Sequence, residues 1–251
     1  MTLEVLFTPA GLGPHEVAGR AVFVIDVLRA STTICAALHH GARAIVPVLT
    51  ADEAMRLAQT LGPDDVVLAG ERGSERIPGF TLGNSPLEMT PAALRGRTVV
   101  MTTTNGTAAL LAAQSGSEVY VASAVNLAAA GARAREILAE HGDLVIICAG
   151  RDSRFSLEDA YAAGRLAHEA LGGRWIRRGL NDAAVAAVDL LRRYGPRWER
   201  VFSRCAAGRQ LRRLGMAADI EDAARENAYP VLPLFRERRI TAAAPSGVLT
   251  P

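Results

Sequence analysis

The sequence predicts an α/β fold, in which a mostly parallel sheet carries helices on both faces and a helical C-terminal part follows. Over the first two-thirds of the chain, short apolar runs alternate with stretches of helical periodicity. Several of these runs are apolar throughout, as in strands that are buried on both faces. After Gly172 and Gly173 the helical periodicity continues with a single strand-like run. These observations place an α/β domain at residues 1–172 and a mainly helical subdomain, packed on it, at 173–251.

The expected elements follow along the chain from these patterns. Apolar runs predict strands at residues 21–27, 44–48, 66–69, 98–102, 118–122, 144–148 and 229–234. Helical periodicity predicts helices at residues 31–40, 51–61, 106–114, 126–141, 157–171, 182–194, 198–205, 208–214 and 220–227. Residues 71–86 are rich in Gly and Pro, and are expected to form a long loop near a functional site.

The composition excludes several classes of function. The net charge is +2 and aromatic residues make up 5%, so neither charge nor base stacking indicates a nucleic-acid partner. All 28 basic residues are arginines, which excludes a Schiff-base lysine and a phosphate-loop lysine. No apolar stretch is long enough to span a membrane. Three widely spaced cysteines and an N-terminus without a secretion signal predict a cytoplasmic protein.

Polar residues follow four of the predicted strands. Asp26 and Arg29 come at the end of the first, Glu71 and Arg72 after the third, and residues 103–107 after the fourth. The strand at 144–148 leads into a loop and a helix that begins with two acids. Because ligands bind beyond the carboxyl ends of parallel strands, we expect these groups to meet in one crevice.

Residues 103–107, with the sequence Thr-Thr-Asn-Gly-Thr, resemble an anion cradle. A glycine at a strand-to-helix turn exposes backbone N–H groups, and a helix N-terminus favours negative charge. The same residues would also serve as a helix cap, without any ligand. The sequence leaves both readings open.

Acidic residues at the predicted crevice indicate a metal site. Asp26 follows an apolar run, and a buried carboxylate needs a metal, an arginine or backbone donors as partner. Glu158 and Asp159 begin a helix, where they would also stabilise the helix dipole. Mg²⁺ prefers carboxylate oxygens, so two or three of Asp26, Glu71, Glu158 and Asp159 could hold one ion. The alternative for Asp26 is a structural pair with Arg29 or a helix cap.

The segment from Cys148 to Arg154 satisfies the pattern C-x5-R. In phosphatases with this pattern, a thiolate attacks phosphorus and the arginine binds the phosphoryl oxygens. Asp152 lies inside the loop and would repel a phosphate. A buried cysteine at a strand end is the alternative interpretation.

Five segments, taken together, resemble the 2-phosphosulfolactate phosphatase family. They are residues 24–33, 69–72, 79–86, 102–107 and 148–150 with 155–160, in the order and at the spacing of the family. The resemblance continues through Leu211, Gly215, Asp219 and Pro233, and so covers nearly the whole chain. The chain departs from the family pattern at Thr81, where Asp is usual, and at Ala108, where Arg is frequent.

The resemblance implies a Mg²⁺-dependent phosphatase that hydrolyses (2R)-phospho-3-sulfolactate to 3-sulfolactate and phosphate. That reaction is a step in coenzyme M biosynthesis. The resemblance also implies a cytoplasmic homo-oligomer, which we expect to be a homodimer. A non-catalytic binder of small phosphorylated or sulfonated anions remains the alternative class of function.

On this reading the site residues fall into three groups. The expected metal ligands are Asp26, Glu158 and Asp159. The expected catalytic residues are Asp26, Arg29, Glu71 and Arg72. The expected substrate-binding residues are Ser31, Thr32, Asn84, Ser85, Thr103, Thr104, Asn105, Gly106 and Thr107.

Four arginines on the two loops around the crevice could bind further acidic groups of the substrate. They are Arg72, Arg76, Arg151 and Arg154. The alternative is that Arg76, Arg151 and Arg154 are solvated charges on exposed loops.

Overall fold

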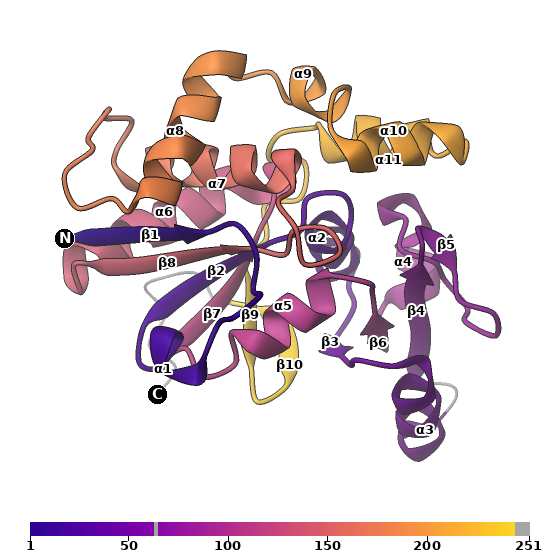
Figure 1. Cartoon of the computed structure of the whole chain (residues 1–251). Coiled ribbons are helices and arrows are strands. Elements are labelled where there is room, and N and C mark those ends of the chain that lie inside the picture. Colours follow the sequence, from indigo (N-terminus) through magenta and orange to yellow (C-terminus); the bar gives the residue numbers. More distant parts are fainter. Residues whose placement is uncertain (63–64, 244–251) are drawn as a thin grey trace.

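The computed structural model describes residues 1–62 and 65–243 (Figure 1). Its strands are β1 (Thr2–Leu6), β2 (Ala21–Ile25), β3 (Ala44–Pro47), β4 (Val66–Arg72), β5 (Glu75–Arg76), β6 (Thr98–Thr102), β7 (Glu118–Ala122), β8 (Asp143–Cys148), β9 (Pro233–Arg236) and β10 (Arg239–Ala242). Its α-helices are α1 (Pro14–Val17), α2 (Ala30–His39), α3 (Ala51–Leu61), α4 (Pro91–Leu94), α5 (Gly106–Ala112), α6 (Leu127–Glu140), α7 (Leu157–Ala170), α8 (Asp182–Tyr194), α9 (Trp198–Phe202), α10 (Ala206–Arg213) and α11 (Ala217–Ala223). Two short 3₁₀ helices, η1 (Pro86–Glu88) and η2 (Ala124–Asn126), complete the described elements.

The strands form one sheet in the order β1-β8-β2-β7-β9-β10-β3-β6-β4-β5. Two groups within it are parallel: β1, β8, β2 and β7 on one side, and β3, β6 and β4 on the other. The hairpin β9–β10 joins them and pairs antiparallel with β7 and with β3. This confirms the predicted α/β class with a mostly parallel sheet.

Sheet twist brings the carboxyl ends of both strand groups to one place. Strand β7 is connected to β3 by three antiparallel pairings: β7 with β9, β9 with β10, and β10 with β3. In a flat sheet, the carboxyl ends of the two strand groups would therefore lie at opposite edges. A twist of about 20–25° per strand turns one group across the other. In Figure 1, β1 and β8 run across the view whereas β4 and β6 run up it.

Helices cover both faces of the sheet, as the buried strands require. Along β2, Phe23 and Ile25 join a core with α6, α7 and α8, whereas Val22 and Val24 join a core with α2 and α5. Successive residues of a strand point to opposite faces, so β2 needs apolar partners on both sides. A smaller core lies between α3 and strands β4 and β6.

The C-terminal part is helical as far as α11 and then returns to the sheet. The predicted strand at 229–234 begins instead at Pro233, and residues 239–242 form a second strand that the sequence did not predict. Proline has no N–H to donate to the ladder, which suits the first position of β9. The domain boundary at residue 172 stays a prediction.

Residues 71–86 form less loop than expected, because β4 continues through Arg72 and pairs with β5. Strand β1 was also missed in the sequence, since its five residues mix polar and apolar side chains at one edge of the sheet. Within residues 1–62 and 65–243, none of the helices combines the length and the apolar character that crossing a bilayer requires.

Candidate active site

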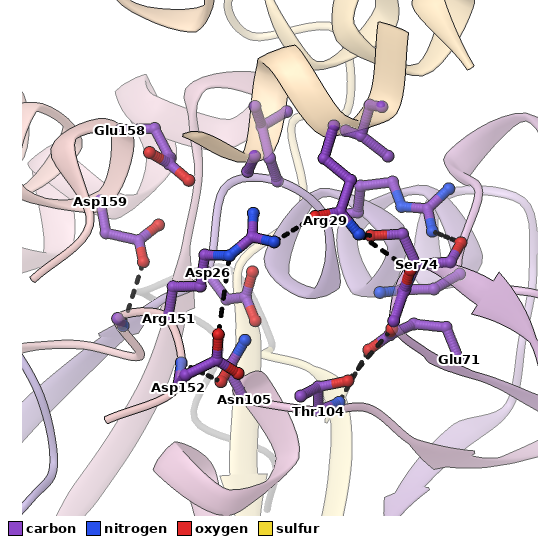
Figure 2. A pocket seen from close by; sticks show the side chains of 17 residues that line it. Asp26, Arg29, Glu71, Ser74, Thr104, Asn105, Arg151, Asp152, Glu158 and Asp159 are labelled. Carbon is purple, nitrogen blue, oxygen red and sulfur yellow. Dashed lines mark hydrogen bonds and ion pairs between the residues drawn. The ribbon is translucent and has the colours of Figure 1, made fainter. Parts of the chain in front are cut away.

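A pocket opens where the two groups of parallel strands converge, and side chains from both groups line it (Figure 2). Asp26 and Arg29 follow β2, Glu71 belongs to β4, and Thr104 and Asn105 follow β6. The loop after β8 and the first turn of α7 form another wall, and α10 contributes from the C-terminal part. The predicted crevice at the strand ends therefore exists as a pocket.

The loop after β2 folds back on itself and fixes Asp26. The Asp26 N–H donates to the Ser31 hydroxyl at 2.8 Å, and the Ser31 N–H donates to the Asp26 carbonyl at 2.8 Å. The side chain of Thr32 hydrogen-bonds the Val27 carbonyl and lies 2.7 Å from the Ser123 hydroxyl. Ser31 and Thr32 thus hold the loop that positions Asp26.

Glu158 and Asp159 sit in the first turn of α7, behind the capping residue Ser156. The Asp159 carboxylate accepts hydrogen bonds from the N–H groups of Val27, at 3.0 Å, and Gly150, at 3.2 Å. It therefore ties the end of β2 to the end of β8. Both acids are buried and both line the pocket.

Burial and neighbouring negative charges raise the pKa of two carboxyls in the pocket, those of Asp26 and Asp159. Burial, together with the charges of Glu71 and Glu158, raises the pKa of Asp26 to about 7. Burial, followed by the charges of Asp26 and Glu158, holds the pKa of Asp159 well above its ordinary value. The repulsion between these carboxylates is reduced either when one of them is protonated or when a cation binds among them.

On the opposite wall, Glu71 organises two loops. Its carboxylate accepts from the N–H of Thr104, at 2.7 Å, from the Thr104 hydroxyl, at 3.1 Å, and from the N–H of Ser74, at 2.7 Å. Thr103 and Thr107 bond each other, since each backbone N–H donates to the other's hydroxyl. The hydroxyls of Thr103 and Thr104 and their backbone N–H groups thus already have partners in the protein. This arrangement fits the helix-cap interpretation better than the anion cradle.

Arg29 is anchored from three directions. Its guanidinium donates to the Asp219 carboxylate at 2.6 Å, to the Ser74 carbonyl at 2.6 Å, and contacts the sulfur of Met216 at 3.2 Å. The Ser85 hydroxyl donates to the other oxygen of Asp219, also at 2.6 Å. The preceding Leu28–Arg29 peptide bond is cis. Arg29 is therefore paired with Asp219 of α11, and not with Asp26 as the structural alternative supposed.

The pocket is rich in acids. Among the described residues, five carboxylates and two guanidinium groups line it, and the acids are Asp26, Glu71, Asp152, Glu158 and Asp159. The two arginines are Arg29 and Arg151. An anionic ligand could enter such a pocket only with a compensating positive charge.

The type and number of these side chains determine which metal ion could bind in the pocket. Within residues 1–62 and 65–243, no group of three or more Asp, Glu, His or Cys side chains is arranged to hold one. Mg²⁺ does not require such a group, because it keeps several waters and binds through one or two carboxylates plus substrate phosphate oxygens. Asp26 with Glu158 or Asp159 supplies buried carboxylates of that kind at one pocket.

Comparison with known proteins decides the family. The family model described as 2-phosphosulpholactate phosphatase matches residues 6–238. The chain belongs to the 2-phosphosulfolactate phosphatase family. A probable 2-phosphosulfolactate phosphatase of Symbiobacterium thermophilum is 41% identical over 226 residues, which cover 90% of this chain and 95% of that protein.

Two further relatives carry the same name. The protein of Deinococcus radiodurans is 42% identical over 213 residues, 84% of this chain and 85% of its own. The protein of Carboxydothermus hydrogenoformans is 40% identical over 233 residues, which cover 93% of this chain and 92% of that protein. The chain is thus a phosphoric monoester hydrolase by family, as its motifs predicted.

In this member of the 2-phosphosulfolactate phosphatase family, the pocket gathers part of the predicted site. The predicted residues that line it are Asp26, Arg29, Glu71, Asn84, Thr104, Asn105, Glu158 and Asp159. Ser31, Thr32, Ser85, Thr103, Gly106 and Thr107 lie behind these residues in the described structure, where they hydrogen-bond or pack around them.

Arg72 does not reach the pocket within the described structure. Its guanidinium donates to the Thr102 hydroxyl at 2.9 Å and to the Leu49 carbonyl at 3.1 Å. Because β4 continues through Arg72, the side chains of Glu71 and Arg72 point to opposite faces. The expectation that Arg72 is a catalytic residue therefore finds no support in its position.

Cys148 is also badly placed for the thiolate mechanism. It is fully buried in β8 among apolar residues, and Arg154 is an exposed residue of the loop outside the pocket. Burial, with the charges of Asp159 and Glu158, raises the pKa of the Cys148 thiol well above its ordinary value. A buried, protonated thiol is a poor nucleophile, so the geometry favours the buried-cysteine interpretation.

Sequence reasoning missed the contacts by which the C-terminal helices hold residues of the pocket. Asp219 of α11 holds Arg29, and Gln210 of α10 contacts Gly73 and Ser74. No pattern along the chain connects these residues to strand ends more than a hundred positions earlier. The available signal was the family resemblance, which includes Leu211 and Asp219.

Proposed function

We propose that the chain hydrolyses (2R)-phospho-3-sulfolactate to 3-sulfolactate and phosphate. The reaction adds the oxygen of one water to phosphorus, breaks the bond between phosphorus and the C2 oxygen, and returns a proton to that oxygen. The observation that carries the proposal is the cluster of buried carboxylates around Asp26, in a chain of the matching family. A pocket that only bound anions would gain nothing from acids beside its ligand.

We further propose Mg²⁺ as the cofactor, held by Asp26 with Glu158 or Asp159. When bound, the ion would neutralise charge on the phosphoryl oxygens and supply an ordered water. Asp159 bonds two backbone N–H groups and so stays fixed, and it holds the loop ends on either side of Asp26. Burial in turn keeps bulk water from screening these charges.

Other side chains of the pocket would orient the substrate. Arg29 presents a positive charge whose position is set by Asp219 and Ser74. A charge fixed before the reaction stabilises developing negative charge without reorganisation. Asn84 is buried at the pocket, and its side-chain oxygen has no hydrogen-bond partner within the described structure. It is free to accept from a bound water or ligand.

Pathway, location and assembly are proposed on the family resemblance alone. The reaction would serve coenzyme M biosynthesis in the cytoplasm, and the chain would form a homo-oligomer, a homodimer in the simplest case. Sedimentation velocity of the purified chain tests the last point, where a monomer at micromolar concentration would contradict it.

Phosphate release from synthetic (2R)-phospho-3-sulfolactate tests the proposed function. We expect multiple turnovers with Mg²⁺ present, and 3-sulfolactate in amounts equal to the phosphate. The non-catalytic alternative predicts binding of the same compound in calorimetry without phosphate release. That outcome, with folded protein and added Mg²⁺, would remove the proposed activity.

A further inference from the structure

Arg151 lies in the pocket between the two walls described above. It belongs to the loop after β8, and its side chain is 33% exposed. In Figure 2 it extends between Asp159 on one side and Ser74 on the other. One terminal nitrogen donates to the side-chain oxygen of Gln210, and the Nε lies 3.8 Å from the Asp152 carboxylate.

Gln210 holds Arg151 from the opposite wall. Its amide nitrogen donates to the Gly73 carbonyl at 3.0 Å and lies 3.3 Å from the Ser74 hydroxyl. The Gly73 carbonyl can only accept, so the amide group has one orientation and its oxygen faces Arg151. A residue of α10 thereby connects the loop after β4 with the loop after β8.

The other arginines near the pocket are engaged elsewhere. Arg29 uses both terminal nitrogens for Asp219, Ser74 and Met216. Arg76 donates to the Thr81 carbonyl at 3.3 Å and does not line the pocket in the described structure. Of the four loop arginines expected to meet acidic groups, Arg151 is the one that the described structure places in the pocket.

Arg151 also has a donor to spare. Within residues 1–62 and 65–243, its hydrogen bonds and ion pair involve one terminal nitrogen, the Nε and the backbone, which leaves the other terminal nitrogen for a ligand. A guanidinium binds a carboxylate or sulfonate through a planar fork of donors. In a pocket lined by five carboxylates, a second anionic group needs such a cation beside it.

We propose that Arg151, held in place by Gln210, receives a second acidic group carried by the alcohol part of the phosphoester. The contact with Arg151 is what separates an acid-bearing phosphoester from a plain alkyl phosphate, which lacks it and is hydrolysed more slowly. Arg151 is a specificity residue, and Gln210 is a positioning residue that acts through it. This inference rests on the proposed phosphatase function.

The test compares three substrates: 2-phosphosulfolactate with two further acidic groups, 2-phospholactate with a carboxylate alone, and isopropyl phosphate with neither. We expect Arg151→Ala to lower kcat/KM by about 10- to 100-fold for each substrate whose acidic group binds Arg151. Isopropyl phosphate should change by less than about threefold, because it makes no such contact. The selectivity ratio is kcat/KM for 2-phosphosulfolactate divided by kcat/KM for isopropyl phosphate. Gln210→Ala should lower this ratio by a smaller factor than Arg151→Ala does.

The substrate pattern distinguishes the two acidic groups. A loss confined to 2-phosphosulfolactate places the sulfonate at Arg151, whereas an equal loss for it and 2-phospholactate places the carboxylate there. Arg154→Ala is the matched control, because Arg154 lies on the same loop but outside the described pocket lining. It should leave all three values unchanged.

An equal loss for all three substrates in Arg151→Ala, or no loss at all, would overturn the inference. Thermal unfolding shows whether each variant is folded. Should Arg151→Ala be unfolded, Arg151→Lys keeps the charge without the fork, and its selectivity ratio decides in the same way. A parent chain that hydrolyses none of the three would refute the proposed function itself, an outcome distinct from unchanged selectivity.

Discussion

Gly106 lies against Asp26 so closely that no side chain fits between them. A Cβ at this position would stand 2.7 Å from the Asp26 carboxylate and 2.5 Å from the Cβ of Ala30. Both distances are shorter than normal contacts, so Gly106→Ala must displace Asp26 or the start of α2. We expect a loss of about 1–3 kcal/mol in the free energy of unfolding.

The same variant should lower kcat/KM by about tenfold or more, about 1.4 kcal/mol of barrier, because Asp26 moves. Kinetics and urea unfolding measure the two effects. Gly13→Ala is the control, since its nearest recorded neighbour would be 3.6 Å away. If Gly106→Ala matches Gly13→Ala in both measurements, Asp26 does not need this close contact.

Asp26 should also make the stability of the metal-free chain depend on pH. Its folded pKa of about 7 lies above the ordinary value of 3.8. Between these values the folded state binds more protons than the unfolded state, so this group's contribution to stability falls as pH rises from about 4 to 7. Asp26→Asn cannot ionise and escapes this loss.

We therefore expect Asp26→Asn to gain stability relative to the parent as pH increases from 5 to 8, in EDTA. Urea unfolding at both pH values measures the difference. Removing the charge at position 26 also lowers the pKa of Asp159, which adds in the same direction. If the difference in unfolding free energy between Asp26→Asn and the parent stays constant or shrinks as pH rises, the pKa of Asp26 is not raised in the folded chain.

At the residue scale, the strand-end rule predicted Asp26 and Glu71, which line the pocket, and failed for Arg72. Asp26 and Glu71 could be predicted because polar residues directly follow apolar runs. Arg72 could not be excluded, since the sequence ended its strand at residue 69 whereas β4 continues to Arg72. The alternation that turns its side chain away depends on where that strand ends.

At the scale of elements, α11 fixes the pocket through the buried pair of Asp219 with Arg29. The two side chains are 5% and 4% exposed, and their charged groups are 2.6 Å apart. Asp219→Ala leaves a buried guanidinium without its partner, which typically costs about 3–5 kcal/mol of unfolding free energy. Urea unfolding should show a loss of that size.

Asp189→Ala is the matched control on α8. Asp189 is 45% exposed and pairs with Arg177 at 3.1 Å, and an exposed pair contributes about 1 kcal/mol or less. Comparable losses in the two variants would show that the Asp219 pair does not hold α11 on the pocket.

Tertiary contacts decide the elements that the sequence misplaced. The run at 229–234 has strand-like composition, but Tyr229 is buried beside η2 and the strand begins only at Pro233. Strand β10 pairs with β3 through one pair of residues, Ile240 and Ile45. Pairing between segments almost two hundred residues apart leaves no local pattern to read.

At the scale of the whole molecule, the hairpin β9–β10 joins the two groups of parallel strands. A chain that ends at residue 228 lacks both hairpin strands, so β7 and β3 lose the strands that lie between them. We expect this chain to show no cooperative unfolding transition, because the sheet is divided and the core beside Phe235 and Ile240 is opened.

A chain that ends at residue 243 keeps the hairpin and should unfold cooperatively like the full chain. Circular dichroism during urea titration compares the three. Cooperative unfolding of the 228-residue chain, at the same midpoint, would mean that the two strand groups hold together through their other contacts.

On the proposed function, the pocket around Asp26 hydrolyses a phosphoester with the help of a divalent cation. The most direct measurement is phosphate release from 2-phosphosulfolactate by the parent chain and by Asp26→Asn, after EDTA treatment and after return of Mg²⁺. We expect the parent to lose its activity in EDTA and to recover it with Mg²⁺. Asp26→Asn should stay at least about 100-fold lower throughout, about 2.7 kcal/mol of barrier. Full activity of the parent after chelation, or of Asp26→Asn with Mg²⁺, would contradict the claim.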